Sequence, residues 1–216
     1  MSNLSTKKLQ KVYGILKIIL DLNLSILFIL LGLPIFLFIS ILIKFSSRGS
    51  IFYLQKRIGK NKKYFYCIKF RTMHPEADDI LENLLNMNPD IKKEFEKTHK
   101  IKNDPRITLI GKFLRKTSLD ELPQFINVLR MEMSIIGPRP IVDEETSKYG
   151  SSISKVLSIK PGMTGLWQVS GRNNLSYKRR VFLDNHYVDN YGFLMDLRII
   201  IRTFGVVFFP MDRGAY

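Results

Sequence analysis

A stretch of 22 residues without a charged side chain, residues 22–43, is the strongest constraint on how this chain can fold. A helix of that length is about 33 Å long, which is enough to cross the hydrocarbon core of a bilayer. A secretory signal peptide is a poor alternative, because the apolar stretch is too long and no small-residue cleavage site follows it. The sequence therefore predicts a helix that enters a membrane.

Glycine and proline interrupt this stretch at its centre. Pro34 lacks a backbone N–H donor and clashes with the preceding helical turn, so a sharp kink or a break is expected at Gly32 and Pro34. Lysines precede the stretch, and it is followed by the basic residues Lys44, Arg48, Lys56 and Arg57. Because both flanks are cationic, the positive-inside rule gives no direction of crossing, as expected when both ends stay on the cytoplasmic side. We predict a re-entrant helical hairpin that dips into one leaflet, in preference to a spanning helix with a proline kink.

Charge and cysteine content narrow the class of protein. The 216 residues carry a formal net charge of +15, which indicates a polyanionic partner: nucleic acid, an anionic membrane surface or a phosphorylated substrate. The single cysteine, Cys67, excludes an internal disulfide and a multi-cysteine metal site, and it fits a reducing, cytosol-facing location. It lies in an apolar and aromatic run, so a buried, inert thiol is expected.

Two adjacent carboxylates, Asp120 and Glu121, follow a basic run that ends at Lys116. Ser118 and Glu121 have the spacing of a capping box, which predicts a helix from Ser118 to about Met131, and Asp120 in the same turn is favoured by the helix dipole. On the local sequence alone, capping is the simpler interpretation. The same geometry also suits chemistry, because a carboxylate that faces cations stays ionised and can act as a nucleophile or a metal ligand.

Alternating and helical patterns predict the remaining elements. β-Branched and aromatic residues at 51–58 and 64–70 predict a β-hairpin. Lys69 and Arg71 share one face of its second strand, either as a solvated face or as a clamp for an anion. Helical patterns occur at residues 75–100 (interrupted at Asn88 and Pro89), 107–115, 176–191 and 197–209. The last of these is either a helix in the membrane interface or a buried terminal helix.

Two loops rich in proline or glycine present cationic side chains. Arg139 lies between Pro138 and Pro140, so a stiff loop presents it. Residues 160–172 include three glycines, which permit close approach of a ligand, and an aromatic stacking face. The residues of interest in that loop are Lys160, Gly162, Trp167, Gln168 and Arg172. A glycine-rich turn is common, so this loop alone is weak evidence for a phosphate site.

Several kinds of site are excluded. The three histidines, His74, His99 and His186, lack the spacing of a zinc site or of a serine-nucleophile site. Neither a Walker phosphate loop nor a dinucleotide-binding fingerprint is present. Any phosphate chemistry must therefore use arginines, carboxylates and a divalent cation. Because no nucleic-acid motif is present, a membrane-tethered basic binding protein without catalysis is the weaker alternative.

A series of collinear motifs resembles the bacterial sugar transferase family, the monotopic polyprenyl-phosphate phosphoglycosyl transferases that start polysaccharide assembly. The resemblance covers nearly the whole chain, and the chain looks like the catalytic module alone. The motifs are Lys69-Phe70-Arg71-Thr72-Met73, Asn103-Asp104-Pro105-Arg106, the run from Arg115 to Gln124 around Asp120-Glu121, Gly137-Pro138-Arg139-Pro140, and residues 160–172.

Patterns and resemblance together predict a mostly helical α+β fold. Residues 1–45 would form a basic segment and the re-entrant membrane hairpin. Residues 46–216 would form a compact cytosolic catalytic domain with a small β-hairpin and interfacial amphipathic helices. One departure concerns the membrane break: many relatives have Ser before the breaking proline, whereas Leu33 precedes Pro34 here. A Ser hydroxyl could satisfy backbone groups that the break frees, so its absence bears on the bend angle and the topology.

The resemblance implies a reaction at the cytoplasmic face of the bacterial inner membrane. Asp120 would attack the phosphate next to the sugar of a UDP-sugar, release UMP and hold a phosphosugar-aspartyl intermediate. Glu121 would assist with Mg²⁺ and the incoming undecaprenyl phosphate, and both carboxylates would ligate the metal. The expected substrate-binding residues are Lys69, Arg71, Arg106, Arg115, Pro138, Arg139, Pro140, Gly162, Trp167, Gln168 and Arg172.

The C-terminal segment, from residue 171 to residue 216, resembles members that use galactose-1-phosphate. Glucose and N-acetyl amino sugars are the alternatives. The product would enter exopolysaccharide, capsule or O-antigen synthesis, and a homodimer stays an open alternative to a monomer.

Overall fold

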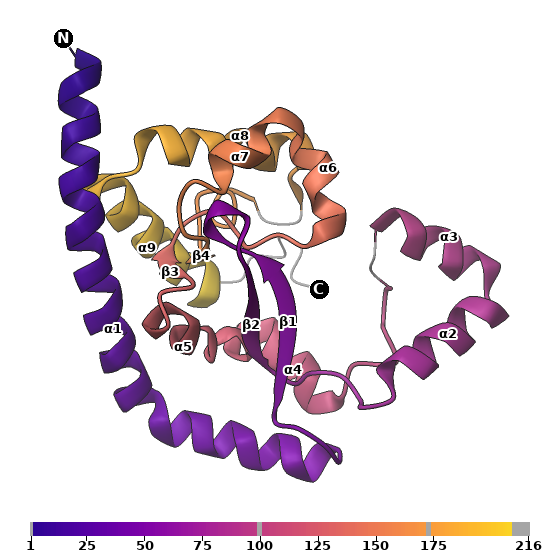
Figure 1. The fold of residues 1–216 in the computed structure, drawn as a ribbon. Coiled ribbons are helices and arrows are strands. Elements are labelled where there is room, and N and C mark those ends of the chain that lie inside the picture. Colours follow the sequence, from indigo (N-terminus) through magenta and orange to yellow (C-terminus); the bar gives the residue numbers. More distant parts are fainter. Residues whose placement is uncertain (1, 99–100, 172–173, 209–216) are drawn as a thin grey trace.

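One long helix, α1 Ser2–Ser46, opens the chain and contains the apolar stretch. In this computed structural model the residues described are 2–98, 101–171 and 174–208. Pro34 lies inside α1, and Figure 1 shows that the helix bends in its second half. The chain therefore bends rather than breaks into two helices, and the re-entrant topology itself stays a prediction. Among the described residues, α1 alone is long and apolar enough to cross a membrane, judged by length and composition.

The predicted β-hairpin is confirmed. Strand β1 Phe52–Ile58 pairs antiparallel with β2 Tyr64–Phe70, and a short 3-10 turn, η1 Lys60–Lys62, joins them. Tyr53 lies opposite Lys69 and Gln55 opposite Cys67. Because side chains alternate along a strand, Lys69, Cys67 and Arg57 share one face of the hairpin. This face becomes a wall of the candidate site.

Helices make up most of the rest of the chain, as the sequence predicts. The helical pattern predicted at residues 75–100 corresponds to α2 Ala77–Met87 and α3 Pro89–Thr98. These two helices project away from the body of the molecule in Figure 1. The other elements are α4 Leu109–Thr117, η2 Leu119–Glu121, α5 Gln124–Leu129, η3 Asp143–Glu145, α6 Thr146–Tyr149, η4 Gly150–Ser152, α7 Ile153–Val156, α8 Tyr177–Asn190 and α9 Phe193–Phe208. Helix α9 begins before the predicted residue 197, and its interfacial position stays a prediction.

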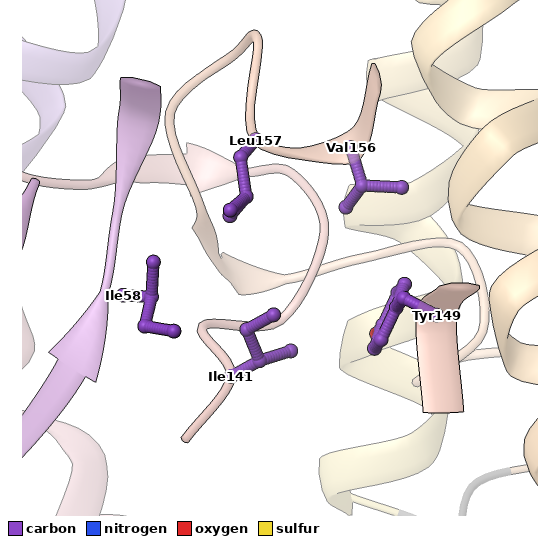
Figure 2. Packing of buried hydrophobic residues seen from close by; sticks show 5 residues of the cluster. All are labelled: Ile58, Ile141, Tyr149, Val156 and Leu157. Carbon is purple, nitrogen blue, oxygen red and sulfur yellow. The ribbon is translucent and has the colours of Figure 1, made fainter. Parts of the chain in front are cut away.

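A second, parallel pair of short strands lies beside the hairpin. Strand β3 Ser134–Ile136 pairs with β4 Gly162–Thr164. The loop that leaves β3 passes the end of the hairpin, where the Ile58 N–H donates to the Ile141 carbonyl at 2.9 Å. Apolar packing holds this junction, as Figure 2 shows for Ile58, Ile141, Tyr149, Val156 and Leu157. The junction fixes the loop that contains Arg139 against the hairpin.

Both ends of α1 contact the same folded body. Near the C-terminal end, Ile39 and Ile43 pack with Phe70 and Leu114. Toward the N-terminus, the Tyr13 hydroxyl donates to Asp196 Oδ2 of α9 at 2.8 Å. The centre of the apolar stretch also contacts this body, because Phe28 stacks on Phe125 of α5 with 5.1 Å between the ring centroids.

Candidate functional site

The backbone between α4 and α5 places the two carboxylates. Helix α4 ends at Ser118, which has the left-handed φ of 57°. The predicted capping box is wrong, because a helix N-cap needs extended backbone, and the Ser118 side chain caps neither η2 nor α5. The single helix predicted to run to Met131 is instead the short turn η2 followed by α5. Asp120 and Glu121 lie in that turn, beside the hairpin.

Two cationic side chains form ion pairs with the same oxygen of Glu121. Lys69 Nζ lies 2.9 Å from Glu121 Oε1, and Arg139 Nη1 lies 3.7 Å from the same atom. Burial alone would raise the pKa of Glu121, but Lys69 and Arg139 outweigh it and lower this pKa to about 2. Glu121 is therefore ionised throughout the neutral range, and it holds Lys69 by the shorter of the two contacts.

Asp120 differs from its neighbour in charge balance. Burial and the adjacent Glu121 carboxylate raise the pKa of Asp120 to about 6, against the opposing effects of Lys69 and Arg115. Arg115, at the end of α4, donates from Nε to Thr72 Oγ1 at 2.9 Å. A carboxylate with a pKa near neutrality and a cation close by can act as a nucleophile or a metal ligand.

A pocket opens on this group of charges. It is lined by Arg57, Cys67, Lys69, Glu121, Gln124, Arg139, Pro140, Gly162 and Met163. Four of the predicted substrate-binding residues, Lys69, Arg139, Pro140 and Gly162, meet here. The sequence prediction missed Arg57 and the buried Gln124. For Arg57 a signal existed, since the strand alternation that places Lys69 on this face places Arg57 there too.

Two predicted arginines have other partners. Arg71 donates from Nη2 to the Ser47 carbonyl at 2.8 Å and to the Ser47 hydroxyl at 3.0 Å, at the end of α1. Lys69 contacts Glu121 and Arg71 contacts Ser47, so the two side chains have different partners in this structure, and their joint role as an anion clamp stays a prediction. Arg106 is buried and forms a bidentate ion pair with Asp104, with Nη2 2.7 Å from Oδ2. This pairing indicates that Arg106 stabilises the turn before α4.

The glycine-rich loop contributes its backbone more than its aromatic ring. Trp167 is only 7% exposed, and the Arg180 guanidinium lies over its ring at 4.7 Å, so that face is not open for stacking. Gln168 Nε2 donates to the Met163 carbonyl at 3.0 Å, which holds a pocket residue in place. Pro138 is buried. Arg172 lies outside the described residues.

The donor set fits one kind of metal site. The described residues contain no group of three or more His, Cys, Asp or Glu side chains that could hold a metal ion. Mg²⁺, however, is usually bound by one or two carboxylates together with substrate phosphates and water. The neighbouring carboxylates of Asp120 and Glu121 fit that arrangement. Cys67 is buried, and burial raises its thiol pKa, so it fits the predicted inert role.

The family model and the relatives that match this chain agree on one family. The family model described as "Bacterial sugar transferase" matches residues 12–210. The exopolysaccharide production protein ExoY of Rhizobium meliloti (strain 1021) is 45% identical over 211 residues, which cover 98% of this chain and 92% of that protein. The UDP-galactose-lipid carrier transferase of Erwinia amylovora is 47% identical over 168 residues, 78% of this chain and 35% of that protein. The undecaprenyl-phosphate galactose phosphotransferase of Salmonella typhimurium (strain LT2) is 44% identical over 201 residues, 93% of this chain and 42% of that protein.

Proposed function

Because this chain belongs to the bacterial sugar transferase family, we propose that it transfers a sugar-1-phosphate from a UDP-sugar to undecaprenyl phosphate and releases UMP. The names of two relatives, one acting on a lipid carrier and one on undecaprenyl phosphate, support this donor and acceptor. The name of the ExoY relative supports a place in exopolysaccharide synthesis. The reaction would occur at the cytoplasmic face of the inner membrane.

The observation that carries the proposal is an unequal pair of adjacent carboxylates among cations. Glu121 lines the pocket, and Asp120 precedes it in η2, where Lys69 and Arg115 act on its charge. Glu121 is neutralised by Lys69 and Arg139, whereas Asp120 has a pKa of about 6. Two neighbouring acids in such different environments are suited to different tasks. Asp120 is the better nucleophile of the two, because within the described part of the chain an ion pair holds Glu121 but not Asp120.

In the first step, an Asp120 carboxylate oxygen attacks the phosphorus that bears the sugar. The bond from that phosphorus to the oxygen bridging the two phosphates breaks, and UMP leaves with the electron pair. Lys69, Arg115 and Arg139 stabilise the negative charge that moves onto the phosphate oxygens. This step leaves the sugar phosphate as an acyl phosphate on Asp120.

In the second step, an oxygen of undecaprenyl phosphate attacks the same phosphorus. The bond between phosphorus and Asp120 breaks, which restores the carboxylate and yields a sugar diphosphate lipid. Mg²⁺, when bound by Asp120 and Glu121, would supply charge neutralisation at the diphosphate. Glu121 keeps Lys69 at the pocket during both steps through the 2.9 Å contact between Lys69 Nζ and Glu121 Oε1.

We propose galactose as the sugar, because the printed names of the Salmonella and Erwinia relatives both contain galactose. Glucose, which differs from galactose at one stereocentre, is the nearest competitor. No residue of the pocket by itself distinguishes the two hexoses.

Intact-protein mass spectrometry tests the proposal. The purified chain is incubated with Mg²⁺ and either UDP-galactose or UDP-glucose, in parallel with Asp120→Asn. A hexose-phosphate adduct is expected on the wild-type protein after incubation with UDP-galactose. The Asp120→Asn variant should form no adduct with either donor. An adduct with UDP-glucose only would overturn the sugar assignment. Absence of both adduct and UMP, even with undecaprenyl phosphate added, would overturn the transferase proposal.

A further inference from the structure

Arg57 is a buried cation in the wall of the pocket. It is 9% exposed and lies in β1, on the face that also contains Lys69 and Cys67. A buried guanidinium is costly unless its donors are satisfied, so its contacts indicate what it does.

The contacts of Arg57 connect the hairpin to the loop that contains Arg139. Nη1 donates to the Pro140 carbonyl at 3.0 Å, and Nη2 donates to Gln55 Oε1 at 2.7 Å. Glu145 Oε2 lies 3.7 Å from Nη1 and also accepts from the Val142 N–H at 3.2 Å. Arg57 thus joins its own strand to two points on the segment after Arg139.

Arg139 has few contacts of its own that fix its direction. Its side chain is 35% exposed, and its ion pair with Glu121 is long at 3.7 Å. Pro140 has no backbone N–H, so its carbonyl is the group by which a neighbour can hold this residue. The Ile58 N–H holds the next residue, Ile141. The two successive β1 residues Arg57 and Ile58 therefore fix the backbone directly after Arg139.

We propose that Arg57 is a positioning residue: by holding the Pro140 carbonyl, it aims Arg139 at the diphosphate of the sugar-nucleotide donor. This inference rests on the proposed function, because it assigns Arg139 to that substrate. A long, flexible arginine would otherwise lose rotamer entropy on binding each donor molecule, and a fixed loop removes part of that cost.

A double-mutant cycle separates positioning from a merely structural role. The variants are Arg57→Gln, Arg139→Gln and the double variant, with Arg57→Lys as a milder change. Lys56→Gln is the matched control, since it removes one positive charge from the same strand where Lys56 lies exposed over the Tyr64 ring. UMP release gives kcat and KM for UDP-galactose, calorimetry gives the affinity for UDP with Mg²⁺, and thermal unfolding shows which variants are folded.

Arg57→Gln is expected to raise KM and weaken UDP binding about tenfold, with a smaller change in kcat, as for the loss of one charged hydrogen bond. In the Arg139→Gln background the same change should cost less than about twofold, because the group that Arg57 positions is already absent. The KM and UDP affinity of Arg57→Lys should lie between those of the wild type and Arg57→Gln. Lysine keeps the positive charge, but its ammonium group cannot reproduce the planar arrangement of donors by which a guanidinium reaches three acceptors. Lys56→Gln should match the wild type.

Two results would overturn the positioning role. Equal losses in both backgrounds would mean that Arg57 acts on the donor directly or only on the fold. Unchanged UDP affinity in Arg57→Gln would mean that the Pro140 contact does not matter for binding. Calorimetry keeps the test independent of turnover: a wild type that binds UDP without releasing UMP would refute the proposed function, while the cycle in UDP affinity would still decide the role of Arg57.

Discussion

Adjacent residues in one chain can have opposite protonation chemistry, as Asp120 and Glu121 do. Both are partly buried, which favours their neutral forms. Glu121 forms ion pairs with Lys69 and Arg139, which favour its ionised form. The charge of Glu121 itself disfavours ionisation of Asp120. The ionised Glu121 carboxylate thus contributes to the raised pKa of Asp120, after burial.

The first prediction is an acidic limb in the pH profile. Asp120 must be ionised to attack, and its pKa is about 6, so kcat/KM for UMP release should fall about tenfold per pH unit below pH 6. Glu121, with a pKa of about 2, should add no second ionisation between pH 4 and pH 6. Initial rates at fixed Mg²⁺ and low UDP-galactose measure the profile. A flat rate down to pH 4.5 would contradict the assignment of Asp120.

The second prediction concerns stability. The pKa of Asp120 is higher in the folded protein than its ordinary value of 3.8, so its ionisation disfavours the folded state at every pH above about 6. Asp120→Asn should therefore raise the free energy of unfolding by about 1–3 kcal/mol at pH 7 while abolishing the adduct. The gain should shrink as the pH falls from about 6 to 4.

Thermal or denaturant unfolding in detergent measures this gain. Glu144→Gln removes an exposed acid and serves as the control. A destabilised Asp120→Asn variant at pH 7 would show that the carboxylate has a structural role that its environment does not reveal.

At the scale of elements, the β3–β4 pair depends on close backbone contact. A Cβ on Gly162 would overlap the backbone of Gly137, and it would lie 2.6 Å from the Thr164 carbonyl oxygen. Gly162 also lines the pocket beside Arg139. Strand pairing and pocket shape therefore both depend on having glycine, which has no side chain, at position 162.

The third prediction is that Gly162→Ala destabilises the protein by about 2 kcal/mol or more, because the overlap is with backbone that cannot move aside. UMP release should fall with it. Gly205→Ala in α9 is the matched control, since nothing lies within 4 Å of its added Cβ, and a helical Ala should be neutral or stabilising. Equal melting temperatures for the two variants would show that the β3–β4 contact tolerates a side chain.

Elements with a strong periodic signal were predictable from sequence, and contacts between distant segments were not. The hairpin strands are rich in β-branched and aromatic residues, so their bounds followed from the pattern, whereas the environment that Lys69 faces did not. The role of Ser118 did not follow, because a capping-box spacing does not reveal a left-handed backbone. Nor did the partners of Arg71 and Arg106, since Ser47 and Asp104 compete with a phosphate only once the chain has folded.

At the scale of the whole molecule, α1 and the catalytic elements form one packed body. Asp21, directly before the apolar stretch, is buried and accepts from the Ser134 hydroxyl at 2.6 Å and from the Ile135 N–H at 3.3 Å. Those two residues lie in β3, the strand that leads into the loop of Arg139. Helix α1 therefore supports the strand that leads to the loop of the pocket residue Arg139.

The contacts of α1 also bear on its topology. On the N-terminal side of the apolar stretch, Tyr13 and Lys17 bind Asp196 of α9. At the C-terminal end of the stretch, its last residue Ile43 packs with Phe70 and Leu114. A helix that crossed the bilayer would separate these two groups of contacts by the full membrane thickness, about 30 Å. We therefore expect both groups of contacts to lie on one side of the membrane, as in the predicted re-entrant arrangement.

The fourth prediction is that both flanks of α1 are accessible from the cytoplasm only. The wild type is a suitable background for cysteine labelling, because its single cysteine, Cys67, is 1% exposed. Asn23, the second residue of the apolar stretch, and Ser50, which follows the stretch, are both exposed. Gln10 lies nearer the N-terminus, before the stretch. In cells, Gln10→Cys and Ser50→Cys should both resist a membrane-impermeant maleimide added outside and react once the inner membrane is opened. Labelling of Gln10→Cys from the outside alone would establish a spanning helix, and the contact between Tyr13 and Asp196 could then not exist in the membrane-bound protein.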